Sequence, residues 1–121
     1  MMNTLLEYLK SRKVLDLGFI EFITLTRINH KEFKLFSVNN QDYMISRIFD
    51  ESDAVGFSLI KTNEILETNK TNLVVFAAVE GDDVICFNTA DNSIWIWCLQ
   101  TGNGECIKIS DTFRAFIQMI I

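Results

Sequence analysis

Residues 73–99 read LVVFAAVEGDDVICFNTADNSIWIWCL, and this stretch decides the fold class. Three apolar runs, 73–79, 84–88 and 93–99, each have the composition and length of a strand. The short segments between them, EGDD and TADN, are rich in residues that form tight turns. Short strands joined by tight turns are typical of an antiparallel meander.

A further strand and a closing helix are predicted after this meander. Residues 100–104 contain two glycines and predict a turn, and residues 105–109 predict the next strand. Ser110 can cap a helix that follows it. The apolar residues of that helix recur at helical spacing and form one face: Phe113, Phe116, Ile117 and Ile120.

The N-terminal segment predicts a second helix, over residues 4–13. Thr4 and Glu7 have the spacing of a capping box, in which each side chain bonds the backbone of the other residue. Helices at both ends of an antiparallel meander indicate an α+β fold. We therefore predict a single domain over residues 1–121, an antiparallel sheet meander covered by an N-terminal helix and a C-terminal closing helix.

The middle of the chain is patterned less clearly. Residues 19–28 and 43–49 favour strands, because they are rich in β-branched and aromatic residues. Residues 31–38 fit either a helix or a strand. Asn39-Asn40 predicts a turn in both cases, since asparagine tolerates the left-handed region.

The segment before the meander predicts one strand and one helix. Residues 57–60 have the composition of a short strand. Thr62 is expected to cap a short helix over residues 63–69, with Ile65 and Leu66 turned inward.

Charge is distributed unevenly along the 121 residues, which include no proline and have a net charge of −5. Residues 1–48 have seven basic and five acidic side chains, whereas residues 49–121 have four basic and eleven acidic ones. An acidic half repels phosphate backbones, so direct nucleic-acid binding is disfavoured. Its charge instead suits a basic partner, or simply keeps a small domain soluble.

The sequence places the protein in the cytoplasm by default. No run reaches the roughly 18–20 apolar residues that cross a bilayer, and the N-terminus lacks the pattern of a secretory signal. The three cysteines, Cys86, Cys98 and Cys106, lie in strand-like runs without metal-ligand spacing. They are expected to be small buried thiols in a reducing compartment.

Catalytic and metal-binding patterns are missing from the sequence, so we predict no enzyme, no cofactor and no metal. His30 is the single histidine, and no phosphate-binding or nucleophile motif is present. The acidic loop that starts at Asp50 is not a calcium loop, because Ala54 occupies a ligand position. Asp82 and Asp83 are interpreted as solvated turn acids.

Trp95 and Trp97 share one face of a predicted strand. One interpretation, which we favour, places them in the core against the closing helix. The other makes them anchors of a protein interface, where tryptophan is enriched.

From Leu59 to Ile117 the chain resembles the SUKH superfamily, the Smi/Knr-type proteins. The resemblance rests on the order and spacing of six pieces: residues 61–66 (KTNEIL), 74–77 (VVFA), 80–83 (EGDD), 84–88 (VICFN), 93–97 (SIWIW) and 109–117 (ISDTFRAFI). Residues 31–36 (KEFKLF) followed by Asn39-Asn40 are similar to a helix and turn of the family, which favours a helix there. The family's usual Leu-Pro before that helix is absent.

The resemblance implies a non-enzymatic α+β domain that binds protein, most often a bacterial immunity protein that neutralises a cognate toxin such as a nuclease. We therefore expect a basic toxin domain as partner and no membrane. An alternative is a regulatory or scaffolding domain that binds an endogenous protein. From charge and turns, the candidate partner-binding residues are Asp50, Glu51, Asp53, Glu80, Asp82, Asp83 and Asp91, with Trp95 and Trp97 as possible anchors.

Overall fold

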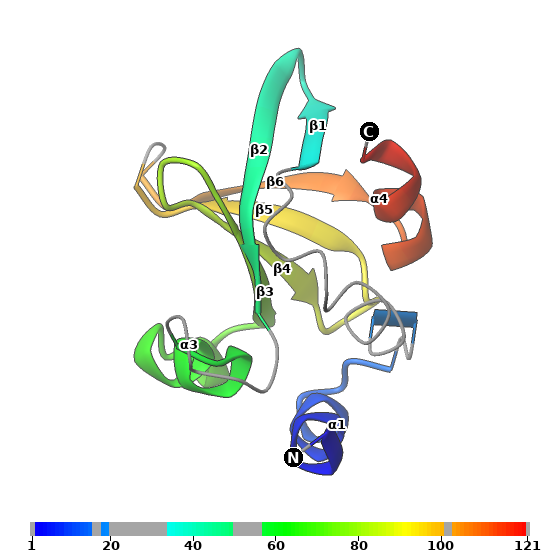
Figure 1. Ribbon diagram of the computed structural model, residues 1–121. Helices are drawn as coiled ribbons and strands as arrows, with labels where there is room; N and C mark the ends of the chain where they lie inside the picture. Colours follow the sequence, from blue (N-terminus) through cyan, green and yellow to red (C-terminus); the bar gives the residue numbers. More distant parts are fainter. Residues whose placement is uncertain (1, 16–17, 20–33, 50–56, 101–102, 121) are drawn as a thin grey trace.

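A computed structural model describes residues 2–15, 18–19, 34–49, 57–100 and 103–120. Within them, six strands form one antiparallel sheet in the order β1-β2-β3-β4-β5-β6, so each strand pairs with its neighbours in sequence (Figure 1). The strands are β1 Lys34–Val38, β2 Gln41–Ile48, β3 Leu73–Val79, β4 Val84–Asn88, β5 Ile94–Cys98 and β6 Glu105–Ser110. The helices are α1 Met2–Ser11, α3 Leu59–Ile65, the 3-10 helix η2 Thr68–Lys70 and α4 Phe113–Met119. The predicted α+β fold with an antiparallel meander is confirmed.

The core lies between α4 and one face of the sheet. Phe113 of α4 packs edge-to-face on Phe19 at 5.5 Å between ring centroids and lies 5.8 Å from Phe76 of β3. Phe116, one turn later, contacts the rings of Phe36 and Phe76 at 5.5 and 6.0 Å. Edge-to-face pairs of this kind stabilise beyond the area that they bury. The predicted apolar face of the closing helix is therefore confirmed.

The cap predicted at Ser110 is wrong, because Ser110 ends β6 and the Thr112 hydroxyl accepts the hydrogen bond from the Ala115 amide at 3.0 Å.

The start of α1 differs from the prediction. The helix begins at Met2 and ends at Ser11, so Thr4 lies inside it and the predicted capping box is wrong. Leu5 and Leu9 are fully buried, as the apolar spacing requires. Lys13, with φ of +65°, turns the chain after the helix.

Residues 34–38 form a strand, so the helix favoured by the family resemblance is wrong there. Phe36 is buried and stacks on Tyr43, its cross-strand partner, whereas Leu35 is 44% exposed. This alternation follows from a period of two residues, and pairing with β2 outweighs the local helical spacing. Asn39 and Asn40 both adopt left-handed φ values, 53° and 62°, which confirms the predicted turn. The rest of the ambiguous segment, including the strand predicted over 19–28, lies outside the described residues except Phe19.

The strand predicted over residues 57–60 and the cap predicted at Thr62 are both wrong. Ser58 is the N-cap of α3, and its hydroxyl accepts a hydrogen bond from the Lys61 amide at 3.1 Å. Thr62 is buried within the helix, and Ile65 is 52% exposed rather than turned inward. The run FSLI has strand composition, but its serine satisfies an open amide of the first helical turn.

Consecutive turns of the meander lie at opposite ends of the sheet. At one end the Gln100 amide donates to Asp83 Oδ1 at 2.8 Å, which joins the β3–β4 turn to the segment after β5. At the other end Asn92, in the β4–β5 turn, donates to the Lys13 carbonyl at 3.0 Å. We call these the Asp83 end and the Asp91 end. Figure 1 shows α4 over the sheet, with α1 and α3 near the start of β3.

Candidate functional site

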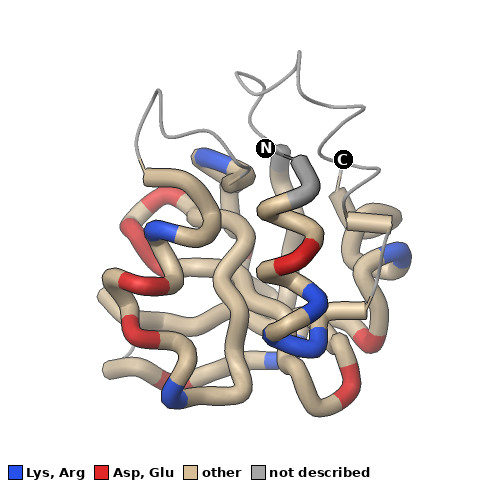
Figure 2. The backbone as a smooth tube through the Cα atoms, turned by 90° about the horizontal axis from the view of Figure 1, so that it is seen from below, with Lys and Arg blue, Asp and Glu red and all other residues tan. Residues whose placement is uncertain are grey.

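The predicted acidic residues do not form one patch. Glu80 and Asp82 are exposed at the Asp83 end of the sheet, whereas Asp91 is exposed at the Asp91 end. Figure 2 likewise shows acidic positions on both sides of the molecule. The remaining acidic loop residues lie outside the described residues: Asp50, Glu51 and Asp53.

Asp83 belongs to the interior, so its interpretation as a solvated turn acid is wrong. Its side chain is 2% exposed and accepts the hydrogen bond from Gln100. Asp82 adopts a left-handed φ of +68°, so the two neighbouring carboxylates point apart, one outward and one inward. Asp83 therefore fixes the geometry of this end instead of offering its charge to a partner.

The two tryptophans lie on the sheet face opposite to α4, so the interpretation that packs them against the closing helix is wrong. Ile94 pairs with Phe87, whose ring contacts Phe113 of α4, and alternation along β5 turns the indoles to the other side. Trp95 and Trp97 are partly exposed there. Their cross-strand partners on β6, Lys108 and Cys106, are both exposed. Anchoring of a partner by these indoles stays a prediction.

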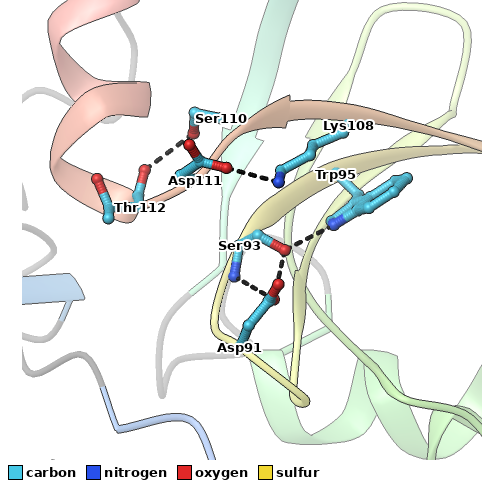
Figure 3. A network of polar contacts seen from close by, with 7 residues as sticks. All are labelled: Asp91, Ser93, Trp95, Lys108, Ser110, Asp111 and Thr112. Atoms are coloured by element: carbon cyan, nitrogen blue, oxygen red, sulfur yellow. Dashed lines mark hydrogen bonds and ion pairs between the residues drawn. The ribbon is translucent and has the colours of Figure 1, made fainter.

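A chain of hydrogen bonds holds the Trp95 indole at the Asp91 end (Figure 3). Trp95 Nε1 donates to Ser93 Oγ at 2.8 Å, and Ser93 Oγ donates to Asp91 Oδ1 at 2.6 Å. The Ser93 amide donates to the same oxygen at 3.0 Å. These bonds, chiefly the one from the Ser93 hydroxyl, lower the pKa of the Asp91 carboxyl below its ordinary value of 3.8.

The Asp91 end also contains a basic residue. Lys108 Nζ lies 2.5 Å from Asp111 Oδ1, and Asp91 adds a second nearby negative charge. The hydrogen bond with Asp111, followed by these charges, raises the pKa of Lys108. The charges at this end are thus largely compensated.

The Asp83 end is more negative. Glu80, Asp82 and Glu105 form no ion pair with any basic residue in the described part of the chain. The pKa of the Tyr43 phenol is raised first by burial and then by the charges of nearby groups, including Asp83 and Glu105. The negative charge at this end therefore acts on the buried Tyr43 side chain as well as at the surface.

A buried polar network, which the sequence did not predict, joins α1, α3, η2 and β3. The Asn63 amide donates to the carbonyls of Leu59 and Val75 at 2.8 and 2.9 Å, and its oxygen accepts from the Val75 amide at 2.8 Å and the Thr68 hydroxyl at 2.7 Å. Asn63 thereby pairs with β3 as a neighbouring strand would. Arg12 donates to the Thr68 hydroxyl and carbonyl and to the Leu73 carbonyl.

A groove of about 400 Å³ opens beside this network. It is lined by Tyr8, Arg12, Asn63, Glu64, Glu67, Asn69 and Lys70. The Asn63 amide and the terminal nitrogens of Arg12 are already used within the fold, and Lys70 pairs with Glu67 at 3.3 Å. A small polar ligand would find few donors left to recognise it, so the groove is a poor binding site.

The described residues offer little for catalysis. No group of three or more His, Cys, Asp or Glu side chains is arranged to hold a metal among them. Cys86 and Cys98 are buried as predicted, whereas Cys106 is exposed, so the expectation of burial is wrong for that residue. Burial raises the pKa of the Cys86 thiol far above its ordinary value and raises that of Cys106 as well, which disfavours the reactive thiolate. His30 lies outside the described residues.

Comparison with protein families gives the decisive observation: the model of the SMI1 / KNR4 family (SUKH-1) matches residues 8–119. The chain belongs to this family. SUKH proteins are immunity- and binding-type domains that are generally non-enzymatic. Searches of curated proteins and of solved structures gave no match.

None of the helices in the described residues has the length and apolar character needed to cross a bilayer.

Proposed function

We propose that this SUKH protein is a cytoplasmic, non-enzymatic immunity protein that binds a basic toxin domain and neutralises it. The single observation that carries the proposal is the family match over residues 8–119. The charge of the chain supports it, because a net charge of −5 complements a basic protein and accelerates the encounter. A nuclease is a fitting toxin, since the cleft that binds its nucleic acid is basic.

The test is protection of cells from the protein encoded by the gene next to this one. We expect cells that express the neighbour alone to stop growing and cells that also express this chain to survive. Purified, the two proteins should form a one-to-one complex whose affinity falls as salt rises, because the screening length shortens from about 30 Å at 0.01 M to about 8 Å at 0.15 M.

A destabilised variant provides the control for protection. Phe76→Asp puts a charge at a fully buried ring position, so it should lose both folding and protection. Survival that persists with Phe76→Asp, or a neighbour that does not impair growth, would contradict the proposal. Binding to a housekeeping protein without protection would instead support the regulatory alternative.

A further inference from the structure

We propose that the partner docks on the outer face of β5 and β6, with basic side chains of the partner, arginine above all, stacked on Trp95 and Trp97. We call this surface the tryptophan face and define it by Trp95, Trp97, Cys106 and Lys108. This inference rests on the protein-binding function proposed above and names the surface and chemistry that it uses.

The orientation of Trp95 is fixed before any partner binds. Its indole nitrogen donates to Ser93 Oγ, and the Asp91 carboxylate accepts both the hydroxyl and the amide of Ser93 (Figure 3). Ser93 is 1% exposed, so the central hydroxyl of this relay is shielded from water, although Asp91 lies at the surface. A side chain that is already ordered loses less conformational entropy on binding. Asp91 is thus a positioning residue for the indole.

Trp97 lies against the backbone of the next turn. A Cβ atom added to Gly104, whose φ is +82°, would stand 3.8 Å from Trp97 Nε1. The ring also packs on the hydrophobic core, which restricts its rotamers. Both indoles are therefore held along the sheet and present aromatic surface, and such rigid aromatic residues are typical anchors of interfaces.

Acidic residues lie at both ends of the strand that bears the indoles. At the Asp83 end, beyond Trp97, Glu80, Asp82 and Glu105 have no basic partner in the described part of the chain. At the Asp91 end, Lys108 largely compensates Asp91 and Asp111, so the uncompensated negative charge lies at the Asp83 end. Two indoles beside an uncompensated acidic end fit a guanidinium, which stacks on indole rings and pairs with carboxylates.

A second copy of this chain does not fit the same face. A two-fold dimer would bring the same face of both copies together, and acidic residues outnumber basic ones around that face in each copy. Each copy also has a net charge of −5, which adds to the repulsion. Charge complementarity therefore selects a basic partner.

The test is an NMR titration of the full chain with an arginine hexapeptide amide at low salt. We expect shifts of the two indole Nε1–H signals and of the amides of Glu80, Asp82 and Glu105. The amides of Glu64 and Glu67, which are exposed acids of α3 and its C-terminal end, should shift little. Shifts centred on α3, shifts equal at all exposed acids, or no shift at all would each overturn the proposal.

Variants separate aromatic stacking from charge. Trp97→Ala should weaken peptide binding about two- to five-fold, the range of an exposed cation–π contact, and Trp97→Leu should do the same while it keeps the sheet apolar. Glu64→Gln, which removes one exposed acid away from the face, should have a smaller effect. Two results together would overturn the stacking: a lysine hexapeptide binds as tightly as the arginine one, and Trp97→Leu does not weaken peptide binding. They would show that charge attraction alone explains the binding.

The positioning role of Asp91 has its own spectroscopic test. Ser93→Ala removes the acceptor of the indole bond, so the Trp95 Nε1–H signal should shift and exchange faster with water. Asp91→Ala should do the same in part, whereas Asp91→Asn keeps an oxygen acceptor and should restore the wild-type signal. An indole signal unchanged in Ser93→Ala would refute the positioning role.

Failure of this inference is distinguishable from failure of the proposed function. If the chain protects cells but the peptide shifts the NMR signals of α3, the proposed function stands and the proposed docking surface is wrong. If the peptide shifts the NMR signals of the tryptophan face but the protein encoded by the adjacent gene is not neutralised, the docking surface stands and the immunity function fails.

Discussion

Two polar networks in this protein use similar bonds for different purposes. The network around Asn63 is buried and saturated, and it joins two helices to the backbone of Val75 in β3. The relay from Asp91 to Trp95 begins at the surface and ends on a partly exposed indole. Burial decides the difference, because an unpaired polar group costs most where water cannot replace its partner. The first network therefore stabilises the fold, and the second orients a surface.

The largest effect should follow from breaking the buried network at its centre. Asn63→Ala leaves the amide and carbonyl of Val75 without their side-chain partner, so we expect a loss of about 3 kcal/mol of unfolding free energy. Urea unfolding measures it. Asn69→Ala, an exposed asparagine of η2, should change stability by less than about 0.5 kcal/mol. A loss below about 1 kcal/mol for Asn63→Ala would contradict the role of the network.

A smaller loss should follow from changing the cation that ties α1 to this network. Arg12→Lys keeps the charge but loses the fork that bonds the carbonyls of Thr68 and Leu73, so we expect a cost of about 1–2 kcal/mol. Thermal and urea unfolding both measure it. Lys10→Arg, at an exposed position in the last turn of α1, is the matched control and should be neutral. Equal unfolding free energies of Arg12→Lys and Lys10→Arg would show that the hydrogen bonds of the Arg12 guanidinium do not contribute to stability.

Thr62 gives a contrast within the same region. Its buried hydroxyl has no hydrogen-bond partner in the described part of the chain, so Thr62→Val should be neutral or stabilise the fold by up to about 1 kcal/mol. Thr68→Val removes a hydroxyl that bonds Asn63 and Arg12 and should instead destabilise it by about 1–2 kcal/mol. The urea concentration at half-unfolding should therefore stay the same or rise in Thr62→Val and fall in Thr68→Val. Equal losses of unfolding free energy in the two variants would contradict this difference between the two hydroxyls.

The surface relay should respond to pH with little effect on the rest of the fold. Because the folded state lowers the pKa of Asp91, the stabilising charge is present above the ordinary pKa of 3.8 and is lost as the pH falls through the lowered value. The Trp95 indole signal should therefore stay constant from pH 7 to about 4 and change below that. Asp91→Asn should abolish the transition, and Asp111→Asn should leave it in place. A transition that persists in Asp91→Asn would assign it to another group.

The local sequence pattern was sufficient to predict β3, β4 and β5, because each is a run of mostly apolar residues between turn-forming segments. It was also sufficient for α4, whose phenylalanines recur at helical spacing and contact the sheet. It left helix and strand both open for residues 31–38, and pairing with β2 decides for a strand at Lys34–Val38. It failed at Ser58, whose role as a cap depends on which amide its hydroxyl meets.

The candidate site was predicted less completely than the fold. The sequence identified the indole pair and the acidic turns, but it could not tell which face of β5 receives α4. It treated Asp82 and Asp83 alike, although Asp83 turns inward to hold Gln100. No local signal marks Asn63 as a partner of Val75, because the two residues meet only when α3 packs beside β3.

The strands and turns of the meander, the closing helix, the net charge and the family could all be predicted before the fold was known. These properties depend on short-range spacing and on composition, which the chain has before it folds. Three features became clear from the folded arrangement: the indoles face away from α4, the acids divide between two ends, and Asn63 bonds the backbone of Val75 in β3. Those features depend on contacts between distant segments, so packing and the need to pair buried backbone groups select them.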